Sequence, residues 1–215
     1  MRAPRAWHAL TALVALVALV LQLVLIIKGD PVLVEAHPPT VVNRLLRFVA
    51  YFTIQSNLLV LLTTATLARD AGRDGRTWRV VRTAAISGIT VTGLVHWFLL
   101  RKLLELHGSD YVADRLLHLV VPILAVLGWL FFGPRPRVDW GVCLRAACWP
   151  VAWLVVILAQ AAGTGWYPYP FLNHAQHGWG YVLGVCAGIV VLFFAVFAVM
   201  GEYDRRRPPA PVTGS

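Results

Sequence analysis

An aspartate and a histidine stand four residues apart in the stretch DRLLHLVVP, as Asp114 and His118. Residues at this spacing share one face of a helix, so their side chains can touch. A carboxylate beside an imidazole holds the ring in one tautomer and stabilises its cation. A histidine paired in this way can take a proton from a nucleophile and return it to a leaving group. The pair therefore indicates acid–base chemistry as strongly as it indicates a structural contact.

Polar side chains also interrupt the apolar stretch that contains YFTIQSN. Thr53 and Asn57 share a face there, and Gln55 and Ser56 lie between them. Such groups are costly inside a membrane, which makes them candidates for function. The competing interpretation is structural, because a threonine in a membrane helix commonly donates to the carbonyl four residues earlier.

A second histidine, His96, lies near the end of another apolar stretch. A histidine in that setting most often links two helices by a hydrogen bond, and this interpretation stays open. The segment GTGWYPYPFLNHAQHGWG contributes Tyr169, Phe171 and His174 and contains no Lys, Arg, Asp or Glu. Its composition is typical of the membrane interface. It indicates either a plain anchor or a roof over a pocket that is entered from the lipid.

Metal binding is another chemistry that histidines can support. His96, His118, His174 and His177 could converge in space. However, the chain has seven histidines in all and lacks the HxxxH and HxxHH patterns of membrane di-iron enzymes. We therefore predict no metal site and no cofactor.

These side chains must be positioned by helices in a lipid bilayer. The chain has 215 residues, of which 59% are apolar and 13% charged, whereas about a quarter of the residues of a soluble domain are charged. Backbone polar groups in hydrocarbon must be satisfied within a helix, so we predict an all-α polytopic bundle. About six spans fit the length. The predicted spans are 9–27, 45–68, 84–100, 116–132, 148–162 and 181–200.

The distribution of Lys and Arg predicts the orientation, since positively charged loops are retained on the cytoplasmic side. Basic residues cluster at the N-terminus, in the second and fourth loops and after the last span. We predict that both termini are cytoplasmic, with a membrane domain over 1–203 and a disordered tail over 204–215. This topology accounts for the net charge of +9, so nucleic acid is not an expected partner. The Ala-, Val- and Arg-rich composition suggests a bacterial plasma membrane.

Counting residues inward from the predicted span ends places Thr53, His96 and His118 at a similar depth in the outer half of the membrane. No comparable group of polar residues is evident near the cytoplasmic side. A single polar site towards the outer surface is therefore expected.

The segments YFTIQSN, LLHLVVP and GWYPYPFLNH, in this order, resemble the androgen-induced family of multi-span membrane proteins. Animal members of that family hydrolyse fatty acid esters of hydroxy fatty acids and are described as intramembrane threonine hydrolases. The resemblance implies that Thr53 is the nucleophile and His118 the general base, with Ser56 as a rival nucleophile. Asp114 stands where an asparagine is expected in the animal proteins, so its orienting role follows from its spacing alone.

The expected function is that of an intramembrane hydrolase that cleaves a lipid ester through catalytic Thr53, His118 and Asp114. Membrane lipids and the lipid-ester substrate are its expected partners. The alternative is a non-enzymatic carrier or scaffold, in which the same residues bind a solute or fasten helices. The residues expected to contact substrate are Asn57, His96, Tyr169, Phe171 and His174. The group that would stabilise an oxyanion stays open among Gln55, Ser56 and Asn57.

Overall fold

The protein is a bundle of long helices. A computed structural model describes residues 2–29, 39–103, 105–134 and 137–207, and these ranges contain helices and no strands. Five helices are long and apolar enough to cross a membrane, and a sixth span results if the bent pair α2 and α3 is counted as one. The prediction of an all-α, multi-span membrane fold with about six spans is confirmed at this level.

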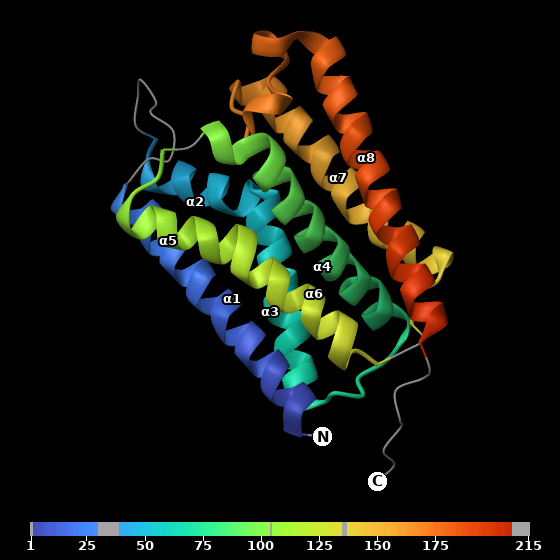
Figure 1. The fold of residues 1–215 in the computed structure, drawn as a ribbon. Helices are drawn as coiled ribbons and strands as arrows, with labels where there is room; N and C mark the ends of the chain where they lie inside the picture. Colours follow the sequence, from blue (N-terminus) through green and yellow to red (C-terminus); the bar gives the residue numbers. More distant parts are fainter. Residues whose placement is uncertain (1, 30–38, 104, 135–136, 208–215) are drawn as a thin grey trace.

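Eight α-helices and four short turns follow one another along the described chain. The α-helices are α1 (Arg2–Lys28), α2 (Val41–Ala50), α3 (Phe52–Arg69), α4 (Arg76–Val95), α5 (Gly108–Arg115), α6 (Val121–Phe132), α7 (Trp140–Thr164) and α8 (His174–Arg206) (Figure 1). The π-helical turns η1 (His96–Leu100) and η3 (Leu116–Val120) extend α4 and join α5 to α6, and η2 (Arg101–Leu103) and η4 (Pro170–Leu172) are 3-10 turns. Each predicted span except 45–68 lies within one continuous helical stretch.

Helix α4 lies at the centre and contacts α3, α6, α7 and α8. Small buried residues such as Ala85, Ser87 and Gly88 let its neighbours approach closely, as is usual between membrane helices. A Cβ atom on Gly88 would lie 2.6 Å from the ring of Trp149 in α7. Two apolar cores result, one shared with α1, α3 and α6 and the other shared with α7 and α8.

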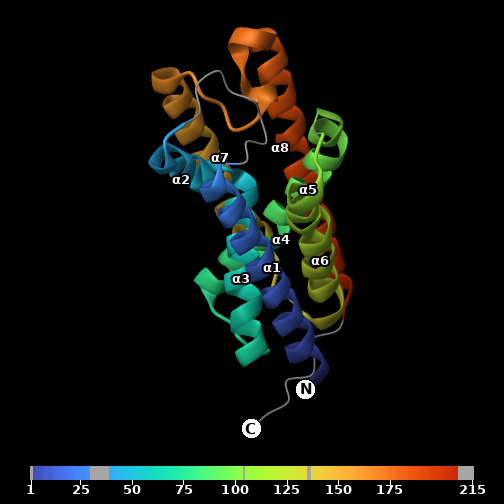
Figure 2. The same cartoon turned by 90° about the vertical axis from the view of Figure 1, so that its left-hand side faces the viewer.

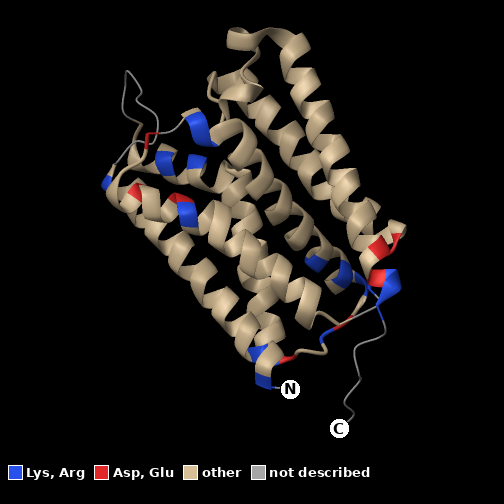
Figure 3. Cartoon of the chain, in the orientation of Figure 1, with Lys and Arg blue, Asp and Glu red and all other residues tan. Residues whose placement is uncertain are grey.

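Charged residues gather at the two ends of the bundle and leave an apolar band between them (Figure 3). The start of α1 and the end of α8 lie at the same end, and α2 lies across the bundle near the other end (Figure 2). Three arginines near that other end face aromatic rings, an arrangement suited to a membrane interface. These pairs are Arg47 with Trp166, Arg101 with Trp97 and Arg115 with Tyr111, at 5.0, 4.2 and 4.8 Å from the ring centres.

The predicted span 45–68 is not one helix, because the chain bends by 67° between α2 and α3. Tyr51 is extended at the bend, with φ −66° and ψ 127°. Two carbonyls that the bend frees at the end of α2 accept hydrogen bonds from side chains. Gln55 Nε2 donates to Val49 O at 3.0 Å, and Trp153 Nε1 in α7 donates to Ala50 O at 2.8 Å. The prediction of an unbroken helix was wrong, because these side-chain donors, one of them from the distant helix α7, replace the missing helical bonds.

The last helix continues beyond the predicted domain boundary at residue 203. Asp204 is buried, and its carboxylate accepts hydrogen bonds from the backbone N–H groups of Arg137 and Val138, the second at 2.9 Å. Residues 204–206, predicted as part of the tail, therefore form the end of α8. Residues 208–215 of the predicted tail lie outside the described ranges.

Replacing Trp153 with phenylalanine removes the hydrogen-bond donor to Ala50 O while keeping an aromatic ring against Phe52. We expect a loss of about 1–2 kcal/mol in stability, because a buried carbonyl is left without a partner. The fall in the thermal midpoint of the detergent-solubilised protein measures this loss of stability. Trp140→Phe is the matched control, since Trp140 is exposed at the start of α7. Equal midpoints for the two variants would contradict this role of Trp153.

Candidate active site

The hydroxyl of Thr53 lies at the broken end of α3, between a histidine and a tyrosine. Its Oγ1 is 3.2 Å from His118 Nε2 and 3.2 Å from the hydroxyl of Tyr169. The carbonyl four residues earlier belongs to α2 and accepts from Gln55 instead. Thr53 thus does not donate to the carbonyl four residues earlier, whereas Ser56 and several other threonines do. Those that donate to the carbonyl four residues earlier include Thr11, Thr63, Thr64, Thr66 and Thr90.

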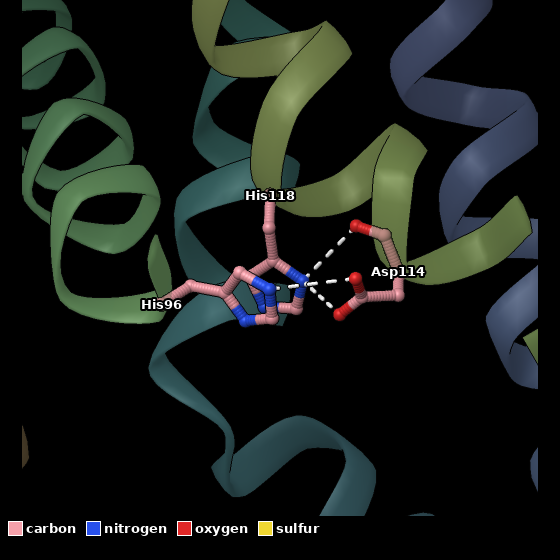
Figure 4. Close-up of side chains that lie close together, drawn as sticks. All are labelled: His96, Asp114 and His118. Carbon is pink, nitrogen blue, oxygen red and sulfur yellow. Dashed lines mark hydrogen bonds and ion pairs between the residues drawn. The ribbon is translucent and has the colours of Figure 1, made fainter. Parts of the chain in front are cut away.

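His118 connects the Thr53 hydroxyl to a buried carboxylate (Figure 4). Its Nδ1 lies 2.9 Å from Asp114 Oδ1 and 3.1 Å from the Asp114 backbone carbonyl. Both neighbours are acceptors at neutral pH, so Nδ1 carries the proton and Nε2 is free to accept one from Thr53. A hydroxyl, an imidazole and a carboxylate therefore form one continuous chain.

The carboxylate of Asp114 lies beside two stacked imidazoles and faces a nitrogen of each. His96 Nε2 is 3.4 Å from Asp114 Oδ2, and the rings of His96 and His118 stack with centres 3.9 Å apart (Figure 4). The Asp114 side chain is only 8% exposed. A buried carboxylate is stable only when it is paired, and the Nδ1–H group of His118 is its nearest partner. This contact brings the end of α4 against α5, but among the described residues neither ring nitrogen of His96 forms the hydrogen bond that its structural interpretation proposed.

Each histidine lies in a wide π-helical turn, a feature that recurs at functional sites. After His118, Pro122 provides a local cause, because its ring crowds the carbonyl four residues earlier and it has no N–H to bond that carbonyl. Gly93 packs against the same carbonyl, where a Cβ atom would lie 3.2 Å from His118 O. The absence of a side chain at Gly93 thus lets α4 bring His96 up to His118.

The group His96, Asp114 and His118 also has the composition of a metal site. One ligand atom from each lies within 4.8 Å of the others. However, the planes of the two rings differ by only 11°. Imidazole donates its lone pair in the ring plane, so the lone pairs of stacked rings run side by side and do not converge on one ion. Metal binding would require one ring to rotate, whereas the arrangement observed already suits proton transfer.

The three side chains considered as hydrogen-bond donors to an oxyanion already form bonds to other groups of the protein. Asn57 Nδ2 donates to the carbonyls of Thr53 and Leu117, at 2.8 and 3.2 Å, and so fastens α3 to η3. Ser56 donates to Phe52 O at 2.8 Å and accepts from Thr92. The Gln55 amide bonds Val49 O and Trp149 Nε1. Asn57, expected to contact substrate, therefore acts between helices, and Ser56 forms its hydrogen bonds with Phe52 and Thr92.

The loop between α7 and α8 reaches into the bundle and does not lie flat on its surface. Tyr169 and Phe171 are buried, their rings stack at 5.3 Å, and Tyr169 approaches Thr53. His174, also expected to contact substrate, is the first residue of α8 and does not line the cavity beside Thr53. It bonds the hydroxyl of Tyr167 at 2.7 Å and stacks on Trp179.

A cavity of about 140 Å³ adjoins Thr53 between α4, α7 and α8. Its wall is largely apolar, with Thr53, Thr92, His96 and Tyr169 as polar exceptions. Three of its residues, Val151, Val190 and Phe194, are also exposed on the outside of the bundle, so the cavity opens between α7 and α8. The apolar lining includes Val91, Val95, Leu154, Phe171, Ile189 and Phe197.

A second set of buried polar residues lies towards the other end of the bundle, where none was expected. His8, Arg82 and Asp204 are each less than a tenth exposed. Arg82 approaches Gly133, and His8 approaches Gly128. The sequence alone does not reveal this set, because His8 and Arg82 lie outside the predicted spans and are buried only by the packing of α1, α4 and α6.

No protein-family model matches the chain, and comparisons with curated proteins and with solved structures find no significant match.

Substituting alanine at Gly93 tests the close approach that holds the two histidines together. The added Cβ atom would meet His118 O at 3.2 Å, and a backbone atom has little room to withdraw. We expect a loss of about 1 kcal/mol or more in stability, from overpacking. Gly184→Ala in α8 is the control, since an added methyl group there would face open space. If both variants unfold at the same temperature in detergent, the packing argument at Gly93 is wrong.

Proposed function

We propose that this protein is an intramembrane hydrolase that cleaves a lipid ester. The observation that carries the proposal is the chain from the Thr53 hydroxyl through His118 to the Asp114 carboxylate, with Thr53 at the wall of an apolar cavity. A nucleophile, a base and a group that orients the base are the parts that acyl transfer requires. The resemblance of three short segments to the androgen-induced family points to the same chemistry and to fatty acid esters of hydroxy fatty acids as candidate substrates.

The first half of the reaction forms an acyl-enzyme. Thr53 Oγ1 attacks the ester carbonyl while His118 Nε2 takes the hydroxyl proton. The bond between the carbonyl carbon and the alcohol oxygen then breaks, and His118 gives its proton to the leaving alcohol. Asp114 holds the proton on Nδ1 throughout and stabilises the transient imidazolium.

The second half releases the acid. Water attacks the acyl-enzyme as His118 Nε2 accepts one of its protons. The bond to Thr53 Oγ1 breaks, and the same proton returns to Thr53. The products are a carboxylic acid and an alcohol, and no redox partner is needed.

The cavity supports an acyl chain as the bound group. Its volume is close to that of cavities that take up one benzene-sized molecule, so it can hold roughly six carbons. A longer chain would continue through the opening beside Val151 and Phe194 into surrounding lipid. An ester with at least one unbranched hydrocarbon chain fits this arrangement.

The proposed enzyme has both termini in the cytoplasm and its active site nearer the outer surface of a bacterial plasma membrane. More Lys and Arg residues lie at the N-terminus, in the second and fourth loops and after the last span than in the other loops, and the positive-inside rule assigns that side to the cytoplasm. The site lies at the far end of α3 from that surface. Substrate would therefore come from the outer half of the bilayer.

The alternative of a non-enzymatic carrier has one observation in its favour. Broken helices inside the membrane are a common element of solute sites in transporters, and α2 and α3 form such a pair. The carrier requires that Thr53 bind a ligand without forming a bond to it. Covalent labelling separates the two functions.

Reaction with a fluorophosphonate probe tests the nucleophile in the detergent-purified protein. We expect wild type to be labelled and both Thr53→Ala and His118→Ala to lose labelling by more than about 100-fold, because nucleophile and base act as a unit. Ser56→Ala is the matched control and should label like wild type. The extent of labelling is measured by in-gel fluorescence, and variants are compared only if their thermal midpoints equal that of wild type, so that all are folded.

Other outcomes of the labelling experiment have defined meanings. Labelling lost only in Ser56→Ala would identify Ser56, and not Thr53, as the nucleophile. Equal labelling of wild type and Thr53→Ala would contradict the hydrolase. Labelling that disappears with a chelator would assign His96, Asp114 and His118 to a metal.

Filling the cavity should change which esters are cleaved. Ala147 lines the cavity on α7, and Ala147→Leu adds three carbons there. We expect the ratio of dodecanoate to acetate p-nitrophenyl ester hydrolysis to fall by about tenfold, equivalent to losing one or two buried methylene groups. Ala152→Leu, on the exposed face of the same helix, should keep the wild-type ratio. Equal chain-length profiles for the two variants would exclude the cavity as the acyl site.

A further inference from the structure

Tyr169 is held against the broken end of α3 by aromatic neighbours on several sides. Its ring stacks on Phe171 and contacts Tyr51 and Trp153, with ring centres 5.8 and 5.9 Å away. Its hydroxyl lies 3.2 Å from both the backbone nitrogen and Oγ1 of Thr53. The side chain is therefore fixed with its one polar atom beside the proposed nucleophile.

The neighbours of the Tyr169 hydroxyl determine where its hydrogen points. The Thr53 N–H can only donate, so the tyrosine oxygen accepts that bond. The tyrosine hydrogen is then directed to Thr53 Oγ1, and the threonine hydrogen to His118 Nε2. Tyr169 thus donates at the atom where the proposed reaction begins.

We propose that Tyr169 is a catalytic residue whose hydroxyl donates the hydrogen bond that stabilises the oxyanion formed when Thr53 attacks an ester carbonyl. This role rests on the proposed function. As the bond between Oγ1 and the carbonyl carbon forms, the carbonyl electron pair moves to its oxygen, and the tyrosine hydrogen turns from Oγ1 to that oxygen. Tyr169 keeps its proton, and the proton lost by Thr53 goes to His118.

Two features suit Tyr169 to this role. The bond it accepts from Thr53 N–H lies in the first turn of α3, where the helix dipole favours negative charge. Burial raises the pKa of the phenol, so the hydroxyl stays neutral and keeps its hydrogen to donate. Gln55, Ser56 and Asn57, the other nearby donors, bond backbone carbonyls instead.

Hydrolysis of p-nitrophenyl hexanoate by the full-length protein in detergent micelles tests the role. Tyr169→Phe keeps the ring and removes the donor, so we expect kcat to fall about 100-fold with KM within about twofold of wild type. Tyr167→Phe is the matched control from the same loop. Its hydroxyl bonds His174 and not Thr53, so its kcat should match wild type.

The alternatives are distinguishable. A wild-type kcat for Tyr169→Phe beside an inactive Thr53→Ala overturns the role of Tyr169 alone, as does an equal loss in Tyr167→Phe. Wild-type hydrolysis no faster than that of Thr53→Ala overturns the proposed function and this role together. If Tyr169→Phe fails to fold, 3-fluorotyrosine at position 169 keeps the contacts and makes a stronger donor. This substitution raises kcat if Tyr169 donates a hydrogen bond to the oxyanion. It leaves kcat unchanged if the role of Tyr169 is structural.

Discussion

Backbone groups freed inside a membrane protein must find partners, and the bend at Tyr51 shows how this chain supplies them. Water is not there to bond an open helix end, and each unsatisfied group costs several kcal/mol in hydrocarbon. Trp153 from α7 and Gln55 from α3 bond the freed carbonyls, and Tyr169 accepts from a freed N–H. The backbone groups freed by the bend are therefore satisfied by side chains from α3, α7 and the following loop.

The same requirement builds the candidate site. Bending the chain at Tyr51 makes Thr53 a residue of the first turn of α3, with no carbonyl of its own helix behind it. The hydroxyl is then available to His118, while threonines deeper in the helices return theirs to the backbone. The break in the helix thus leaves the hydroxyl of Thr53 without its usual backbone acceptor, so that it can react. Tyr169, which accepts a hydrogen bond from the backbone N–H of Thr53, also contacts the Thr53 hydroxyl.

The sequence predicts the parts of this structure that depend on composition and local spacing. Apolar runs predict the spans, and four-residue spacing places Asp114 against His118, although the turn between them is π-helical. Counting depth along separate spans brings Thr53 and His118 to one level. The bend at Tyr51 has no such signal, because neither glycine nor proline marks it and its hydrogen-bond donor in α7 is 103 residues away. Likewise the stacking of His96 on His118 depends on how closely two helices approach at Gly93, which a single sequence does not reveal.

The two walls of the cavity opening differ in how they are fastened. Helix α7 is hydrogen-bonded to both sides of the bend through Trp149 and Trp153, so sliding it outward would break bonds in the membrane interior. Helix α8 is pinned near its far end by Asp204 and Tyr203, and at Gly178 its backbone leaves helical geometry, with φ 74° and ψ 157°. Between these points it meets the cavity through apolar side chains such as Phe193. The wall formed by α8 is therefore held at the opening by apolar packing between Gly178 and Asp204, whereas the wall formed by α7 is held there by hydrogen bonds.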